Sequence, residues 1–116
     1  MKKNNMDYKP LVYVCSPFSG NVELNIKSAR AFSRYAAMKG YIPFTPHLLF
    51  PQFLKDEDVL ERELAMHFNY VLLGKCDEIW VFGSHISKGM KAELEIAERR
   101  KMIIRRFDNS MKEVTA

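Results

Sequence analysis

The sequence predicts an α/β fold: a small doubly wound parallel sheet of the flavodoxin-like type, with helices on both faces. The first observation is that short apolar runs rich in β-branched and aromatic residues alternate with segments of helical periodicity. The second is that the stretches richest in Ser and Gly, 16–20 and 83–89, each follow one of those runs. Strands that alternate with helices imply right-handed crossovers and therefore a parallel sheet.

The length and composition indicate one soluble globular domain. The chain has 116 residues, of which 47% are hydrophobic and 28% are charged. We expect a loose N-terminal tail at 1–9, a single domain at 10–107 and a polar C-terminal tail at 108–116. No apolar run reaches the ~20 residues of a membrane span, and no signal peptide is recognisable, so we expect a cytoplasmic protein that does not bind membranes.

The first predicted strand and helix lie at the start of the domain. Residues 11–15 are apolar nearly throughout, as expected of a buried strand. Asn21 suits the N-cap of the following helix, and Gly40 suits the position just beyond its C-terminus. A short second strand follows at 41–44, and we place it at a sheet edge because Pro43 has no N–H for a ladder hydrogen bond.

The segment 45–54 is apolar but contains prolines, which argue against a long helix. We interpret it as a wall or lid that packs on the core and covers a pocket, with His47 and Phe50 as candidate lid residues. An acidic helix start follows at 56–58. The apolar residues of that helix are expected to form its buried face: Leu60, Leu64, Phe68, Val71 and Leu72.

The second half of the domain repeats the strand–loop–helix pattern. Residues 79–82 form an unbroken apolar run, which is typical of a central strand, and from Gly89 onward the apolar period is helical. Ser87 lies where an N-cap would lie, and Glu93 lies about one turn inside that helix. A last short strand is expected at 102–104.

These elements predict the strand order 2-1-3-4, with a topological switch point between the first and third strands. Doubly wound sheets bind ligands at such a point, outside the carboxyl ends of the strands. The loops at 16–20 and 83–89 lie at those ends. Amides in the first turn of a helix have no partner within the helix, so they favour an anion. The fold and the local chemistry therefore indicate the same site.

Each candidate side chain also has a plain structural explanation. A carboxylate such as Glu93 is most often a solvated helix residue, and Ser87 can cap a helix without contacting a ligand. Tyr13 on a central strand is usually a core residue, unless its hydroxyl reaches the carboxyl end of the strand. Cys15 would be a nucleophile only if a histidine folded over it. For Cys15 and Cys76 we expect reduced thiols.

Several classes of site lack support in the sequence. The three histidines share no ligand spacing, so we expect no metal. Walker and Gly-x-Gly-x-x-Gly motifs are both absent, and we expect no cofactor. The net charge is +4, but the basic residues near the chain ends lack the interleaved aromatic residues of a single-strand binder. We therefore do not expect a nucleic-acid partner.

Three phrases of the sequence resemble a known family. They are Tyr-Val-Cys-Ser-Pro-Phe-Ser-Gly at 13–20, Ile-Pro-Phe-Thr-Pro-His at 42–47 and Ser-Lys-Gly-Met-Lys-Ala-Glu-Leu at 87–94. The last phrase, with the strand before it, resembles the core signature of the nucleoside 2-deoxyribosyltransferase-like superfamily, which includes transferases and nucleotide N-glycosidases. Between Val12 and Arg106 the chain resembles small bacterial and phage proteins of the DUF4406 and DUF7768 type, which are assigned to that superfamily.

The resemblance implies a role for each matching position. Glu93 matches the nucleophile that attacks the anomeric carbon of the sugar, and Tyr13 matches an aromatic residue near it. Ser87 matches a serine that holds the 5′-phosphate in the monophosphate hydrolases. Asn69 falls where the characterised enzymes have an aspartate that helps the leaving base or sugar, and an amide cannot be a general acid in the same way. The other positions implied to bind substrate are Ser16, Phe18, Ser19, Gly20, Gly89 and Met90.

The leading hypothesis is an N-glycosidase or deoxyribosyltransferase that acts on a nucleotide or nucleoside and prefers 5′-monophosphates. Glu93 would form a covalent glycosyl-enzyme intermediate. The alternative is a non-catalytic module that binds or sequesters a nucleotide-derived ligand in the same pocket, with Asn69 marking lost chemistry. The resemblance also implies a homodimer or a higher homo-oligomer, because sites in this superfamily are often completed by a neighbouring subunit.

Overall fold

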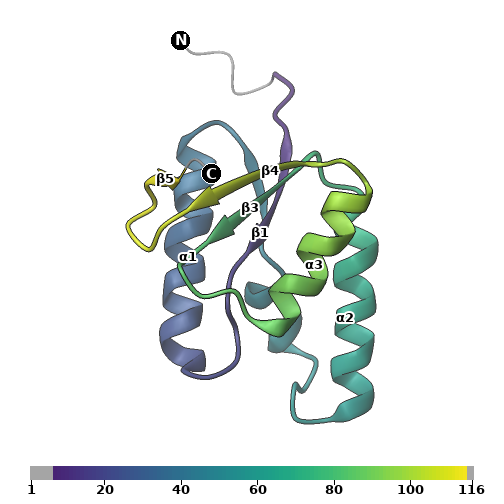
Figure 1. The fold of residues 1–116 in the computed structure, drawn as a ribbon. Coiled ribbons are helices and arrows are strands. Elements are labelled where there is room, and N and C mark those ends of the chain that lie inside the picture. The colour runs from purple at the N-terminus through teal and green to yellow at the C-terminus, as the bar shows by residue number, and fades with distance from the viewer. Residues whose placement is uncertain (1–6, 115–116) are drawn as a thin grey trace.

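The structure is a computed structural model that describes residues 7–114, and its centre is a 5-stranded sheet with the order β2-β1-β3-β4-β5 (Figure 1). The first four strands along the chain pair in parallel, whereas β5 is antiparallel to β4. The predicted α/β class and the order 2-1-3-4 are confirmed, and β2 lies at an edge, as Pro43 requires. The strands are β1 (Leu11–Cys15), β2 (Ile42–Phe44), β3 (Glu78–Phe82), β4 (Ile103–Phe107) and β5 (Glu113–Val114).

Helices cover both faces of the sheet. α1 (Val22–Met38) lies on one face, and α2 (Val59–Leu73) and α3 (Lys88–Arg99) lie on the other (Figure 1). Because side chains alternate along a strand, β1, β3 and β4 each contribute to two cores. The core on the α1 side contains Val12, Val14, Phe32, Ala36, Trp80, Phe82 and Phe107. The core on the other side contains Tyr13, Cys15, Leu73, Ile79, Val81, Met90, Leu94 and Ala97. The alternation therefore directs Tyr13 and Cys15 of β1 toward α3.

Each of these helices begins at a residue whose side chain accepts a hydrogen bond from the first turn. Asn21 Oδ1 accepts from the Leu24 amide at 3.1 Å, and Asp58 Oδ1 accepts from the Leu60 amide at 3.0 Å. Ser87 is the N-cap of α3. The caps satisfy amides that have no partner within the helix. The N-caps predicted at Asn21 and Ser87 are thus confirmed.

The segment after β2 forms a wall of short 3-10 helices, η2 (Pro46–Leu48) and η3 (Phe50–Gln52). Phe50 is buried, and its ring centroid lies 6.2 Å from that of Phe44 in β2 and 5.4 Å from that of Phe68 in α2. The segment therefore packs on the core between β2 and α2, as the sequence predicts. Its prolines are compatible with this path because each 3-10 helix is only three residues long and has its proline at the first or second position, where no N–H is required by the helix.

The outer side of α2 differs from the prediction. The sequence predicts a buried face that includes Leu60, Leu64 and Val71, but these side chains are 77%, 44% and 45% exposed. Leu73 is the fully buried residue of this helix. Apolar residues surround much of the helix, so their spacing alone does not identify the side that packs against α3. Among the described residues, no helix combines the length and the apolar character needed to cross a membrane.

The segment that follows β4 contains β5, which the sequence does not predict. β4 itself extends to Phe107 rather than ending at 104. Its polar residue Arg105 is accommodated because the guanidinium carbon lies 4.6 Å from the Trp80 ring centroid and Nη2 pairs with Glu113 Oε1 at 2.7 Å. Asp108 Oδ1 accepts two backbone amide hydrogen bonds in the turn between the strands. Part of the predicted C-terminal tail is therefore ordered against the sheet.

Candidate active site

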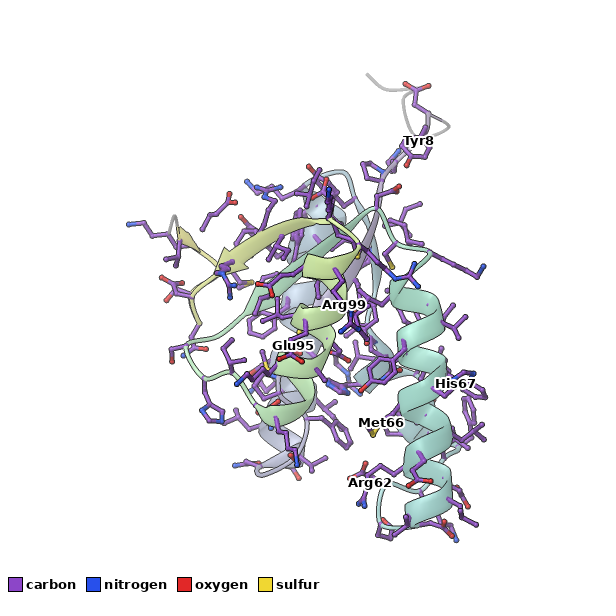
Figure 2. All side chains as sticks on the ribbon, turned by 45° about the vertical axis from the view of Figure 1, so that its right-hand side comes forward. Tyr8, Arg62, Met66, His67, Glu95 and Arg99 are labelled. Carbon is purple, nitrogen blue, oxygen red and sulfur yellow. The ribbon has the colours of Figure 1, made fainter. Side chains whose placement is uncertain are left out.

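A pocket of about 350 Å³ opens at the carboxyl ends of β1 and β3, between α2 and α3. This is the switch point that the strand order predicts. Arg62 and Met66 extend from α2 on the side that faces α3, whereas His67 points away (Figure 2). The structure brings together at this pocket the predicted residues Phe18, Ser19, His47, Phe50, Asn69, Ser87, Gly89, Met90 and Glu93.

Glu93 is a buried carboxyl group at this pocket, with 6% of its surface exposed. The Tyr13 hydroxyl donates to Oε2 at 2.6 Å, and the Cys15 thiol donates to Oε1 at 3.3 Å. Both donors come from β1, which lies beside β3 and under α3. The carboxyl group is therefore held at both oxygens by groups of the sheet, and it is not a solvated helix residue.

Burial raises the pKa of Glu93 above its ordinary value, and the hydrogen bonds from Tyr13 and Cys15 act in the opposite direction. Burial, followed by the charge of Glu93, raises the pKa values of Tyr13 and Cys15 well above their ordinary ranges. Both groups keep their protons at neutral pH and remain donors. Cys15 is therefore not a thiolate nucleophile, because the thiolate is the reactive form.

The N-terminus of α3 forms another part of the pocket. Ser87 Oγ accepts from the Met90 amide at 3.2 Å, and Met90 Sδ accepts from the Ser87 amide at 3.5 Å. The Ser87 hydroxyl is a cap that still carries a proton to donate. A Cβ at Gly89 would meet nothing within 4 Å, so the pocket is open beside the first turn. Free amides and the positive end of the helix dipole favour an anion here.

His47 lies in the wall of the same pocket, and its ring stacks on Phe18 with 5.0 Å between centroids. Its Nε2 lies 2.9 Å from the carbonyl oxygen of Ser16. A carbonyl can only accept, so Nε2 carries the proton. Burial lowers the pKa of His47, so the ring is neutral at neutral pH and Nδ1 holds a lone pair.

Tyr13, Ser16 and Gly20 do not line the pocket. Tyr13 is fully buried and acts on the pocket only through Glu93. Ser16 is 1% exposed, and its Oγ has no hydrogen-bond partner within residues 7–114. Gly20 is exposed at φ +94°, in the turn that leads into α1. The structure therefore does not bring Ser16 and Gly20 to the wall of the pocket, and their role in binding substrate stays a prediction.

Asn69 lies on the inner side of α2, and its buried Oδ1 has no hydrogen-bond partner in the described part of the chain. Sequence reasoning missed Arg62, Met66 and Tyr70, which line the pocket from the same helix. Arg62 Nη1 donates to the Asp56 carbonyl at 3.2 Å. Arg62, Met66 and Tyr70 follow one another at intervals of four residues, which places them on one helix face, and that spacing is the signal that could have identified them.

The chain belongs to a family described as a domain of unknown function (DUF7768), whose model matches residues 10–107. No curated protein matches the chain. Among solved structures, the chain is similar to a 2-deoxyribosyltransferase from the psychrotolerant bacterium Bacillus psychrosaccharolyticus, with a TM-score of 0.71 and 15% identity. That match covers 91% of this chain and 77% of the other. The similarity establishes a shared fold.

We predict that His47 titrates below its ordinary value of 6.5 and carries its neutral-state proton on Nε2. The pKa is lower in the folded state, so the unfolded state binds more protons at acidic pH. The contribution of neutral His47 to the free energy of unfolding is complete above the pKa that His47 has in the unfolded chain, and it is lost as pH falls through the lower pKa of the folded state. Long-range ¹H–¹⁵N spectra over a pH series, with His47→Gln for assignment, test this. A midpoint at or above 6.5, or a proton on Nδ1, contradicts it.

Proposed function

We propose that this protein cleaves the N-glycosidic bond of a nucleotide or nucleoside, as an N-glycosidase or a deoxyribosyltransferase. The observation that carries the proposal is the Glu93 carboxyl group, which is buried, held at both oxygens and still part of the pocket wall. The sequence resemblance and the shared fold support the same chemistry. The link to the DUF4406 group, which the resemblance implies, and the cytoplasmic location, which the sequence pattern predicts, both remain predictions.

The proposed reaction has two displacements at one carbon. Glu93 attacks the anomeric carbon of the sugar, the bond to the base nitrogen breaks, and its electron pair leaves with the base. The departing base takes up a proton from solvent. Water, or the N–H of a second base, then attacks the same carbon and gives up a proton to solvent, and the bond to Glu93 breaks with its electron pair returning to the carboxylate. Tyr13 orients the carboxylate in both steps. Asn69 replaces an acid on the pocket wall, so its amide holds the leaving base by hydrogen bonds rather than by donating a proton.

In this proposal the phosphate of a 5′-monophosphate binds at the N-terminus of α3. Ser87 supplies a hydroxyl proton there, and Ser19 faces the same pocket from the loop after β1. Arg62 adds a guanidinium group to the wall. Phe18 and Phe50 provide apolar surface for the base. Within residues 7–114 no group of His, Cys, Asp and Glu side chains could hold a metal ion, and the proposal requires neither a metal nor a cofactor.

The second candidate function is a non-catalytic module that binds or sequesters a nucleotide-derived ligand. The observation that favours it is the side chain of Asn69. Its buried Oδ1 has no hydrogen-bond donor in the described residues and can accept one from a ligand, whereas its amide cannot act as a general acid. Calorimetric titration and chromatographic detection of free base, with one panel of nucleosides and monophosphates, separate the two functions. Tight binding without base release supports the module.

We predict that Glu93→Gln abolishes base release and leaves the fold intact. The amide keeps the size of the side chain and can accept from Tyr13, but it cannot form the glycosyl ester. The substitution removes a carboxyl group whose charged form burial disfavours, which stabilises the fold, and it weakens the hydrogen bonds to that group, which destabilises it. Because these two effects oppose each other, the free energy of unfolding should change by about 1 kcal/mol or less. Thermal unfolding and chromatography of released base measure both effects.

Glu95→Gln is the matched control for this substitution. Glu95 lies on the same helix but is exposed on its outer side (Figure 2). The Glu95→Gln variant should release base at the wild-type rate. Wild-type activity in Glu93→Gln would contradict the glycosidase proposal.

We predict that monophosphates bind more tightly than the matched nucleosides and that Ser87→Ala narrows the difference. A hydrogen bond to a charged group contributes roughly 1.5–3 kcal/mol, so monophosphate affinity should fall about tenfold to a hundredfold while nucleoside affinity hardly changes. Dissociation constants for both ligands, in wild type and variant, are the measurement. Ser84→Ala, in the exposed loop after β3, is the control. Equal losses for both ligands would mean that Ser87 is only a cap.

We also propose that the protein forms a homodimer or a higher homo-oligomer through the outer side of α2. Leu60, Leu64 and Val71 form an uncovered apolar strip on that helix. Sedimentation velocity should show an oligomer, and Leu64→Glu should dissociate it. Met38→Glu, at an exposed site on α1, should not. A wild-type monomer at micromolar concentration would contradict this proposal.

A further inference from the structure

We propose that Cys15 is a positioning residue that fixes the orientation of the Glu93 carboxylate through its thiol hydrogen bond. The proposal rests on the proposed function of Glu93. It adds a residue of β1 that takes no part in the reaction itself and acts only through the carboxylate.

The geometry of β1 carries this inference. Tyr13 and Cys15 are two residues apart, so they face the same side of the sheet. Each donates to a different oxygen of Glu93, at 2.6 Å to Oε2 and at 3.3 Å to Oε1. The terminal torsion of a glutamate side chain is soft, so a donor at one oxygen alone leaves the other oxygen free to rotate. The second donor, on the same rigid strand, defines the carboxylate plane.

The chemistry of a thiol suits this position. Cys15 is 1% exposed and packs in the core below α3, so it retains its proton and donates continuously. A thiol is a weaker donor than a hydroxyl, so it orients the carboxylate while withdrawing less of its charge. Carboxylate oxygens have about four acceptor sites between them, so each oxygen of Glu93 can accept one hydrogen bond and still present a lone pair to the pocket.

Other titratable and charged groups lie around Glu93. Tyr13 is the second donor on β1. Tyr70 of α2 is also close, because burial and then the charge of Glu93 raise the pKa of Tyr70. The other titratable and charged residues that line the same pocket are His47, Lys55, Asp56, Glu61, Arg62 and Lys88. Because these groups remain in place when Cys15 is changed, a shift in the titration of Glu93 in a Cys15 variant reports the loss of the thiol hydrogen bond.

The experiment compares Cys15→Ala, Cys15→Ser and Cys15→Val with Cys76→Ala. Cys76 is the matched control because it packs against the same core but makes no hydrogen bond to Glu93 in the described residues. The first readout is the pKa of Glu93 from carbon NMR of labelled glutamate in the ligand-free protein. Cys15→Ala and Cys15→Val should raise it, since a hydrogen bond to the charged form is lost. Cys15→Ser should restore it toward the wild-type value.

The second readout is base release. In the two donor-free variants, kcat should fall about threefold to tenfold with KM nearly unchanged, and the serine variant should recover part of the loss. An unchanged Glu93 pKa in Cys15→Val, or an equal shift in Cys76→Ala, would overturn the proposal. If the wild type releases no base, the proposed function fails, while the NMR titration still decides whether Cys15 positions Glu93. If Cys15→Ala does not fold, Cys15→Val provides the donor-free variant.

Discussion

The hydrogen bonds from Tyr13 and Cys15 to Glu93 are the interaction on which the arrangement of the site depends. A carboxylate removed from water costs several kcal/mol unless hydrogen bonds replace its hydration. The donors lie 80 and 78 residues away from Glu93 in sequence. They meet it because β1 pairs in parallel with β3 and the chain after β3 returns over the sheet as α3. The strand order is thus a requirement of the site as well as a consequence of the hydrophobic pattern.

The walls of the pocket differ in their chemistry, and each difference has a local cause. The N-terminus of α3, which Ser87 caps, lines the pocket, and its remaining free amides favour an anion. The loop after β1 brings Phe18, and the segment after β2 brings His47, into a stacked pair. The carbonyl of Ser16 fixes the proton of the His47 ring on Nε2. α2 contributes the amide of Asn69. The proposed function assigns the phosphate of a nucleotide to the helix terminus and its base to the aromatic wall.

Much of the fold could be predicted because its signals are local. The apolar runs of β1 and β3, the caps at Asn21 and Ser87 and the edge position of Pro43 each follow from short-range stereochemistry. The exposed side of α2 and the strand β5 could not be predicted, since both depend on which surfaces meet. Arg105 illustrates the difficulty, because a charged residue in a strand is stabilised here by an aromatic face and by a carboxylate from a later segment.

The site was predictable in part for the same reason. The sequence identifies Glu93 and Ser87 through their place in a helix that follows a buried strand, and both line the pocket. It does not reveal that Cys15 contacts Glu93, because the contact spans the sheet and a helix. It also does not reveal that the Ser16 hydroxyl is buried and that the Ser16 carbonyl holds His47. Contacts between distant segments are therefore the part of the site that required the structure.

Covalent trapping tests most directly whether Glu93 is the nucleophile. A fluorine at C2 of the sugar destabilises the oxocarbenium-like transition state, so a 2′-fluoroarabinosyl 5′-monophosphate slows release of the intermediate. After incubation, peptide mass spectrometry should find the fluorinated sugar phosphate on the peptide that contains Glu93, and fragmentation should place it on that residue. An adduct on another residue, or base release with an inverted anomeric configuration, would contradict the account.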